Sequence, residues 1–243
     1  MNNPSSGTLS IIATPIGNLE DITLRALRIL KECDVVFAED TRRTRVLLDH
    51  YDIRKRLESY HAFNEHARTH SVIQRVLNGE KICMVSDAGS PCIADPGFLL
   101  IREAVFAGIE PQIIPGVSSL TFALAASALP SDKFAFYAFP PVKSGRRAAM
   151  LERIAKEDKT CVVFESPHRI AKLLTEVQTF MGDGTPVALV REATKLHEEV
   201  LRGTVSSVIE RTKNRSWKGE CVLVIGKQVA PDAPERDERD NEE

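Results

Sequence analysis

The stretch from Lys81 to Gly97 constrains the fold of this chain more than any other segment. Residues 82–85 are continuously apolar, which is typical of a strand buried on both faces of a parallel sheet. The loop that follows, 86–97, holds two glycines, two prolines, two acids and otherwise mostly small residues. Taken alone it fits an ordinary turn. After a buried strand of an α/β domain, it predicts a loop whose backbone contacts a ligand.

Two further junctions between strand and loop have the same character. Residues 8–13 form a predicted strand that leads into a loop at 14–23, with a helix cap expected at Asp21. Residues 112–114 lead into a loop at 115–119 and then an apolar helix at about 120–129. Because loops at the carboxyl ends of parallel strands meet at one edge of a sheet, the three loops predict one shared site.

The second half of the chain also alternates between strands and helices, so the predicted fold class is α/β with two domains. The natural boundary lies near Pro115–Gly116. Because the last predicted strands are close together in sequence, the second sheet is expected to be mixed. The predicted strands are 134–139, 160–164, 186–190, 198–201 and 221–225, and the helices are 146–156 and 169–180, with apolar Ile170, Leu173, Leu174 and Val177 on one face. The predicted division is a disordered N-terminus at 1–7, an N-terminal α/β domain at 8–115, a C-terminal α/β domain at 116–227 and a disordered acidic tail at 228–243.

Composition excludes several classes of protein. The chain has no apolar run of about 18 residues and no signal-peptide pattern at its start, so we expect a cytoplasmic location. Its five cysteines are odd in number and widely spaced, which argues against a disulfide framework and against a metal site. Cys33, Cys83, Cys161 and Cys221 lie in apolar segments and are predicted to fill the core, whereas Cys92 lies in the second loop and is a candidate for a chemical role.

The sequence also lacks the motifs that bind polyphosphates. No G-x-x-x-x-G-K-[ST] occurs, and the G-x-G at 182–184 follows a helix rather than a strand. No H-E-x-x-H or G-x-S-x-G occurs either. The sequence therefore gives no support to four classes of protein: nucleotide hydrolases, dinucleotide-binding enzymes, zinc-dependent hydrolases and serine hydrolases. A ligand without a polyphosphate suits the loops.

Charge is distributed unevenly along the chain. Residues 231–243 carry seven acids and two arginines, so the rest of the chain has a net charge of +3 against −2 for the whole. Basic clusters occur at 42–45, 54–56, 143–147 and 211–218. Each cluster alone fits a solvated surface, and together they could form a patch for a polyanion.

Five motifs, at 13–27, 38–42, 86–91, 164–169 and 190–198, closely resemble in order those of the ribosomal RNA small subunit methyltransferase I family, which belongs to the tetrapyrrole methylase superfamily. The resemblance extends over about residues 9–226. It implies two α/β domains of the class III methyltransferase type, with S-adenosylmethionine in the cleft between them, and a homodimer. It also implies methylation of the ribose 2′-oxygen of a decoding-centre cytidine in 16S ribosomal RNA, within the small ribosomal subunit.

The cofactor that the resemblance implies agrees with the character of the loops. S-adenosylmethionine carries a sulfonium cation and no phosphate, so it suits carbonyls, small hydroxyls and an acid better than an anion-binding helix terminus. The sequence departs from the family at 60–65, which lacks the second histidine usual there. Cofactor contacts carried over from the superfamily fall on Pro15, Ile16, Ala88, Gly89, Ser90, Ile93, Ser118, Ser119, Phe164, Ala193 and Thr194.

The implied reaction needs alignment first and proton acceptance second, because a ribose hydroxyl is barely ionised at neutral pH. Glu39, Asp40, Glu192 and Lys195 each lie just past a predicted strand end and are the candidates for proton acceptance or polarisation. For Glu39 and Asp40 the alternative is a helix cap with an arginine ion pair. For Lys195 the alternative is a cation that holds phosphate.

Basic residues supply the candidates for RNA contacts, which would hold phosphates without reading the base sequence. Histidines such as His61 and His168 also fit surface or capping positions. Two other functions stay open: a small-molecule methyltransferase of the tetrapyrrole type, and a cofactor-binding protein without catalysis. The RNA-binding candidates are Arg42, Arg43, Arg45, His61, Lys143, Arg146 and Arg147.

Overall fold

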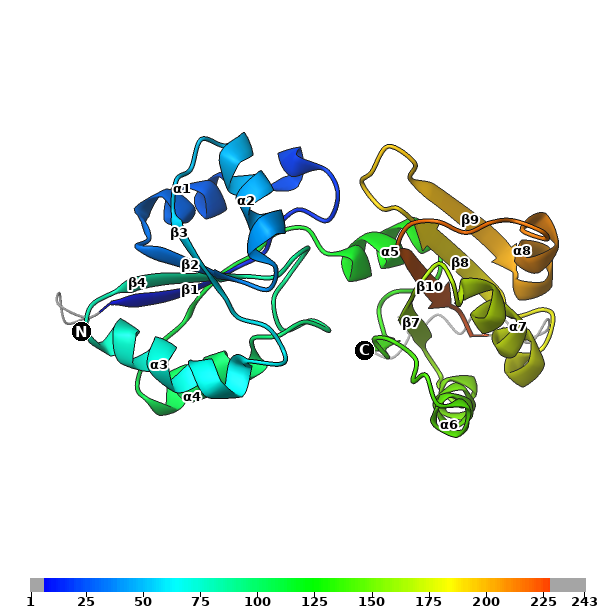
Figure 1. Cartoon of the computed structure of the whole chain (residues 1–243). Helices are drawn as coiled ribbons and strands as arrows, with labels where there is room; N and C mark the ends of the chain where they lie inside the picture. The colour runs from blue at the N-terminus through cyan, green and yellow to red at the C-terminus, as the bar shows by residue number, and fades with distance from the viewer. Residues whose placement is uncertain (1–6, 228–243) are drawn as a thin grey trace, which may run out of the picture. The chain divides into compact units, whose positions relative to one another are not determined.

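The computed structural model describes residues 7–227 and divides into two compact units (Figure 1). Of the described residues, the first unit contains 7–122 together with Glu192–Glu198, and the second contains Ala123–Arg191 and 199–227. The division falls inside helix α5 (Ser119–Ser127), because the third loop leads directly into that helix, whereas the sequence placed the boundary at 115/116. The predicted acidic tail and residues 1–6 lie outside the described residues.

The first unit is built on a five-stranded parallel sheet with the strand order β3-β2-β4-β1-β5. The prediction of a buried parallel strand at Lys81–Val85 is confirmed, since β4 lies between β1 and β2 at the centre of the sheet. Because all five strands are parallel, their carboxyl ends lie at one edge, where the loops begin. The strands are β1 (Thr8–Ile12), β2 (Val35–Ala38), β3 (Arg56–Ser59), β4 (Lys81–Val85) and β5 (Gln112–Ile114).

Helices cover both faces of this sheet, with α1 (Leu24–Glu32) and α2 (Thr41–His50) on one face and α3 (Glu65–Leu77) and α4 (Phe98–Phe106) on the other (Figure 1). The residues of β4 alternate between the two cores, as a strand requires. Ile82 and Met84 join the core under α3 and α4, while Cys83 and Val85 join the other. This double coverage explains why residues 82–85 are apolar without interruption.

Helix α1 begins two residues later than the sequence indicated. Its N-cap is Thr23, whose hydroxyl accepts a hydrogen bond of 3.1 Å from the backbone N–H of Ala26. The predicted cap at Asp21 is wrong, because a 3-10 turn, η1 (Leu19–Asp21), capped by Asn18, occupies that position. Two successive caps therefore connect the first loop to α1.

The second unit contains a five-stranded sheet in the order β6-β7-β10-β8-β9. Only β6 and β7 are parallel, so the prediction of a mixed sheet is confirmed. Strand β6 ends earlier than predicted because the chain turns at Ala138, whose φ is +48°. The strands are β6 (Phe134–Phe136), β7 (Thr160–Glu165), β8 (Pro186–Arg191), β9 (Glu199–Thr204) and β10 (Cys221–Ile225).

Helices α6 (Ser144–Ala155), α7 (Ile170–Met181) and α8 (Val205–Arg211) complete the second unit. The predicted apolar face of α7 is confirmed, because all four of its predicted core residues are buried. Cys161 and Cys221 also lie in this core and Cys33 and Cys83 in those of the first unit, so their prediction as core residues is confirmed. Among the helices formed by residues 7–227, none has the length and apolarity that a membrane span needs.

Candidate cofactor site and active site in the first unit

The first two loops are joined directly after their strands by backbone hydrogen bonds. Thr14 N–H donates to the Gly89 carbonyl at 2.8 Å, and Gly89 N–H donates to the Thr14 carbonyl at 2.9 Å. The Thr14 hydroxyl also donates to the Ser86 carbonyl at 3.3 Å. Gly89 has a φ of +77°, a conformation that favours glycine, so the bridge depends on this residue. The two loops therefore form one rigid surface above β1 and β4.

The third loop packs against the same surface. Ala13 N–H donates to the Ile114 carbonyl at 3.1 Å, which extends the pairing of β1 with β5 into the loops. A Cβ added to Gly116 would lie 2.9 Å from the Cβ of Ala13, so the close approach requires glycine. The structure thus brings the three predicted loops together at one edge of the sheet.

The second loop contains two non-glycine residues in the left-handed region. Cys92 and Ala94 have φ values of +73° and +63°, and a hydrogen bond of 3.2 Å from Cys92 N–H to the Pro96 carbonyl closes the turn between them. Such backbone strain clusters at functional sites. Burial, with the nearby charge of Asp95, raises the pKa of the Cys92 thiol to about 11. Little thiolate forms at neutral pH, so a nucleophilic role for Cys92 loses support.

The segment Glu192–Glu198 also belongs to the first unit, although it follows β8 in the sequence. Asn18 N–H donates to the hydroxyl of Thr194 at 3.2 Å, and the α-carbon of Gly17 lies against Lys195 and Thr194. The sequence placed this motif in the C-terminal domain, and that placement is wrong because its contacts are with the first loop. Glu192 and Thr194 have positive φ values, and an ion pair of 2.9 Å joins Glu192 to Lys195.

Asp40 is the N-cap of α2. Its carboxylate accepts a hydrogen bond of 2.9 Å from Arg42 N–H and forms an ion pair of 2.7 Å with the Arg42 guanidinium. The hydrogen bonds from Arg42 lower the pKa of Asp40 to about 2, which makes this carboxylate a weak base. The structure therefore supports the alternative of a helix cap with an ion pair for Asp40.

Glu39 has the opposite character. Burial and the neighbouring charge of Asp87 raise its pKa, despite the hydrogen bond that it accepts from Asp87 N–H and the nearby Arg43 and His61. Of Glu39 and Asp40, Glu39 is the carboxyl group better suited to accept a proton.

Asp87 connects the second loop to the start of α2. Its carboxylate accepts a hydrogen bond of 2.8 Å from Asp40 N–H and lies 3.5 Å from the Arg43 guanidinium. Asp87 is one of the two acids of the second loop and is not among the site residues predicted from the sequence. Its position two residues after β4, the central strand of the sheet, is the signal that could have identified it.

The predicted RNA-binding residues differ in their exposure. Arg42 and Arg43 have side chains 89% and 65% exposed on α2, and Lys143 and Arg146 are exposed in the second unit. Arg45 is half-buried and donates to the Lys55 carbonyl at 3.3 Å.

Arg147 is not available to a phosphate, so its prediction as an RNA contact is wrong. Its side chain is 3% exposed and pairs with Glu165 at 2.8 Å and Glu176 at 2.5 Å. The residue lies on the same face of α6 as Met150, Leu151 and Ile154, which are buried. Helical spacing therefore placed it inward, whereas the local cluster of charges suggested a surface.

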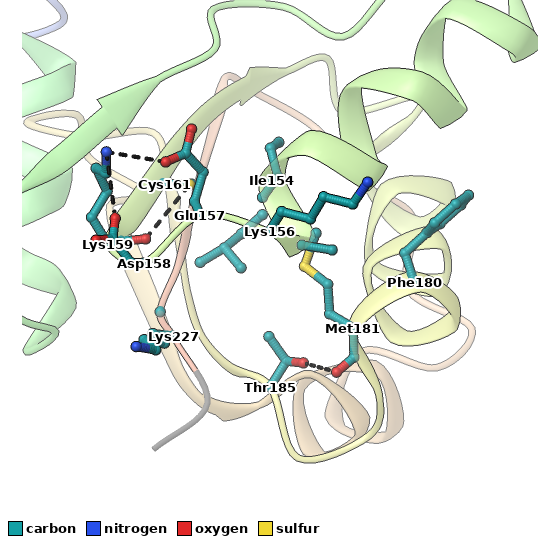
Figure 2. A pocket seen from close by; sticks show the side chains of 13 residues that line it. Ile154, Lys156, Glu157, Asp158, Lys159, Cys161, Phe180, Met181, Thr185 and Lys227 are labelled. Atoms are coloured by element: carbon teal, nitrogen blue, oxygen red, sulfur yellow. Dashed lines mark hydrogen bonds and ion pairs between the residues drawn. The ribbon is translucent and has the colours of Figure 1, made fainter. Parts of the chain in front are cut away.

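The end of β7 carries the remaining candidate, Phe164, in the second unit. Its ring contacts Phe136 and Phe139, with centroids at 4.8 and 5.5 Å. The adjacent Glu165 is fully buried and accepts from Arg147, Arg169 and Ser166 N–H. A cavity of about 420 Å³ lies at the start of the same strand, lined by residues such as Lys156, Lys159 and Met181 (Figure 2). No predicted site residue lines it.

Comparison with known proteins agrees with this fold. The sequence model of the family described as Tetrapyrrole (Corrin/Porphyrin) Methylases matches residues 8–209. Solved structures with a similar fold include uroporphyrin-III-C-methyltransferase from Thermus thermophilus, with a TM-score of 0.62 and 23% identity, covering 91% of this chain and 94% of that chain. The cobalt precorrin-4 methyltransferase CbiF has a TM-score of 0.66 and 21% identity, covering 93% and 97%. Fold and family model together define a class III methyltransferase.

More similar relatives narrow the assignment. The protein named ribosomal RNA small subunit methyltransferase I from Thermotoga maritima is 45% identical over 219 residues, covering 90% of this chain and 98% of the relative. The protein of the same name from Xylella fastidiosa is 43% identical over 229 residues, covering 93% and 84%. The chain belongs to the ribosomal RNA small subunit methyltransferase I family.

Proposed function

We propose that this protein transfers a methyl group from S-adenosylmethionine to the ribose 2′-oxygen of a decoding-centre cytidine in 16S ribosomal RNA. The observation that carries the proposal is the identity of 43–45% to methyltransferases named for ribosomal RNA of the small subunit. The same relationship is our reason to expect a cytoplasmic homodimer that acts on the small ribosomal subunit.

The chemistry of the loops supports this cofactor. Residues 14–23, 86–97 and 115–119 contain no lysine or arginine, and they offer backbone carbonyls, hydroxyls and acids. A sulfonium cation is favoured in such surroundings, whereas a polyphosphate would lack cationic partners. Gly116 lets the backbones approach closely, and Gly89 adopts the positive φ that the bridge between the first two loops needs. The residues of the first unit that would hold the cofactor are Pro15, Ile16, Ala88, Gly89, Ser90, Ile93, Ser118, Ser119, Ala193 and Thr194.

When bound, the cofactor supplies an electrophilic methyl group on a positively charged sulfur. The attacking hydroxyl is a poor nucleophile, so the protein must align it and accept its proton. Glu39 is the proposed proton acceptor, because its raised pKa makes it a stronger base than an ordinary carboxylate. Arg42 and Arg43, which are exposed at the start of α2 just after Glu39 and Asp40, are proposed to hold phosphates. Glu192 and Lys195 form an ion pair that supports the loop beside Gly17.

The test is transfer of labelled methyl to purified small ribosomal subunits that lack the modification, followed by mass spectrometry of the nucleosides. Label on the ribose of a single cytidine is the expected result. Label on a base, or on a porphyrinoid but not on RNA, would refute the proposed substrate. Glu39→Gln should lower kcat by about 10²- to 10⁴-fold, the usual contribution of proton transfer, with cofactor affinity retained. The matched control Glu103→Gln changes an exposed ion pair on α4 and should keep the wild-type rate.

A further inference from the structure

The loop that follows β3 presents one aromatic ring entirely to solvent. Phe63 is 99% exposed, although residues on both sides of it are held by hydrogen bonds. The loop begins at Tyr60, which is buried, and ends at Asn64, the N-cap position of α3. A single exposed apolar side chain is common on protein surfaces, so the groups that surround Phe63 decide whether it meets another molecule.

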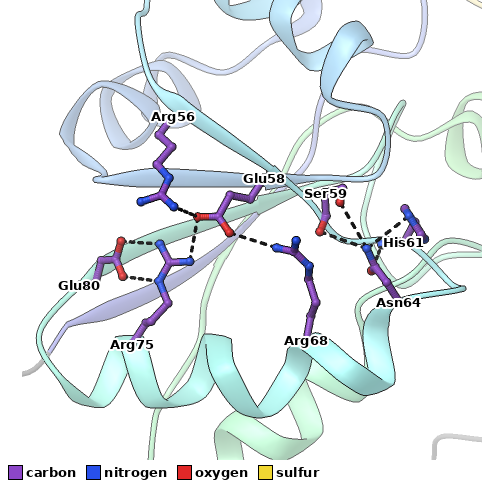
Figure 3. Close-up of polar contacts among 8 residues, drawn as sticks. All are labelled: Arg56, Glu58, Ser59, His61, Asn64, Arg68, Arg75 and Glu80. Atoms are coloured by element: carbon purple, nitrogen blue, oxygen red, sulfur yellow. Dashed lines mark hydrogen bonds and ion pairs between the residues drawn. The ribbon is translucent and has the colours of Figure 1, made fainter.

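Hydrogen bonds fix the backbone of this loop. Tyr60 N–H donates to the Ala38 carbonyl at 2.8 Å, and the buried Tyr60 hydroxyl lies 2.8 Å from that of Thr69. The side chain of Asn64 accepts from His61 N–H at 2.9 Å and donates to the Ser59 carbonyl at 3.3 Å (Figure 3). The backbone that carries Phe63 is therefore held in one conformation, which reduces the entropy that the loop loses when it binds a partner.

The loop lies at the edge of the sheet where the active-site candidates gather. It follows β3, which pairs with β2, and His61 contributes to the electrostatic surroundings of Glu39 together with Arg43. The rings of His61 and Phe63 are inclined at 65° to each other, with their centroids 6.1 Å apart. Arg42 and Arg43 are exposed on α2, which begins at this same edge of the sheet. An exposed aromatic side chain together with exposed arginines is the combination that binds single-stranded nucleic acid.

Polar or small residues surround Phe63 along the chain. Ala62 is small, and Asn64, Glu65 and His66 are polar. The buried core of an interface between identical subunits is more apolar than the rest of the surface, and the chain neighbours of Phe63 do not have that character. An unpaired base needs only one aromatic face, with cations nearby for its phosphates.

We propose that Phe63 is a stacking platform for an unpaired base that neighbours the target nucleotide. The inference rests on the proposed function and names the part of the RNA that this loop contacts. Stacking is tolerant of base identity, so Phe63 would strengthen and orient binding without reading the base edge. Asn64 is a positioning residue, because it holds the loop that carries the ring.

The test compares variants in their affinity for a decoding-region RNA, measured by fluorescence anisotropy. Phe63→Ala should weaken binding by about 5- to 150-fold, as expected for the loss of one stacked base. Phe63→Trp should retain the affinity, and Phe63→Leu, which is apolar without an aromatic face, should not. Phe106→Ala, at another exposed phenylalanine of the first unit, is the matched control and should bind as the wild type does. Circular dichroism verifies that each variant is folded.

Three results would overturn the inference, and they differ from failure of the proposed function. Equal affinity of Phe63→Ala and wild type, or wild-type affinity in Phe63→Leu, excludes stacking while the methyltransferase activity stands. A fall in molecular mass of Phe63→Ala in sedimentation identifies a contact between subunits instead. If the wild-type protein transfers no methyl to RNA and does not bind it, the proposed function and this inference fail together.

Discussion

Replacing Arg147 by methionine should destabilise the second unit by about 3 kcal/mol. Removing one partner of a buried ion pair costs roughly 3–5 kcal/mol, because the other charge stays buried without compensation. Glu165 is fully buried and would keep only the Arg169 guanidinium and Ser166 N–H. Glu176 is partly exposed and can be rehydrated, so the expected loss is at the lower end of the range. Methionine has a similar length and fits among the apolar neighbours on α6.

The single tryptophan of the chain makes this measurement specific to the second unit. Trp217 lies in the core of that unit, so its fluorescence during urea denaturation follows unfolding there. Arg147→Met should lower the urea midpoint with little change in slope. The matched control is Arg146→Ala, at the exposed neighbour, which should stay within about 0.5 kcal/mol of wild type.

A double variant separates the buried charge from loss of packing. Arg147→Met with Glu165→Gln removes the carboxylate that has lost Arg147 and keeps only part of its compensation, and should recover much of the lost stability, to within about 1.5 kcal/mol of wild type. If Arg147→Met unfolds like Arg146→Ala, or if the double variant is no more stable than the single one, the reasoning about the buried charge is refuted.

Two further predictions concern the first unit. Gly17→Ala places a methyl group against Lys195, Thr194 and the Ala193 carbonyl. Overpacking of this kind costs about 1–3 kcal/mol. If the loop shifts by that cost, S-adenosylmethionine binding measured by calorimetry should weaken by about 5- to 150-fold. Gly145→Ala, whose added methyl meets no neighbour, is its control, and equal affinities of the two variants would contradict the prediction. The pKa of Asp40 in the folded state, about 2, lies below its value of about 3.9 in the unfolded chain. The ionised carboxylate therefore stabilises the fold fully above the unfolded pKa, and this contribution is lost as the pH falls through about 2. A carbon-13 titration of the Asp40 carboxyl should have its midpoint near 2, and a midpoint near 4 would show that the pairing with Arg42 is absent in solution.

Local patterns predicted those features that depend on neighbouring residues. The apolar run in β4 identified a strand covered on both faces, because each of its residues enters one of two cores. The helical spacing of apolar residues in α7 identified its buried face for the same reason. The small residues of the three loops predicted their meeting, since parallel strands bring their carboxyl ends together.

Features that depend on distant contacts were missed. Nothing near Thr194 in the sequence shows that its hydroxyl accepts a hydrogen bond from Asn18. The environment of Glu39 depends on Asp87, which lies in the loop after a different strand, β4. At Arg147 the basic cluster at 143–147 indicated the surface, whereas the helical spacing of α6 indicated the core. The residue is buried because Glu165 and Glu176 compensate its charge.

Residues 192–198 belong to the first unit although they follow much of the second unit in the chain, and this order affects folding during synthesis. Asn18 and Thr194 are separated by 176 positions in the chain. The ribosome therefore synthesises all five strands of the parallel sheet long before it synthesises residues 192–198. Domains generally fold as units during synthesis, beginning at the N-terminus. A nascent or truncated chain ending near residue 122 would therefore contain all five strands of the first sheet but lack the residues beside Gly17. The site matures only after most of the second unit has been translated.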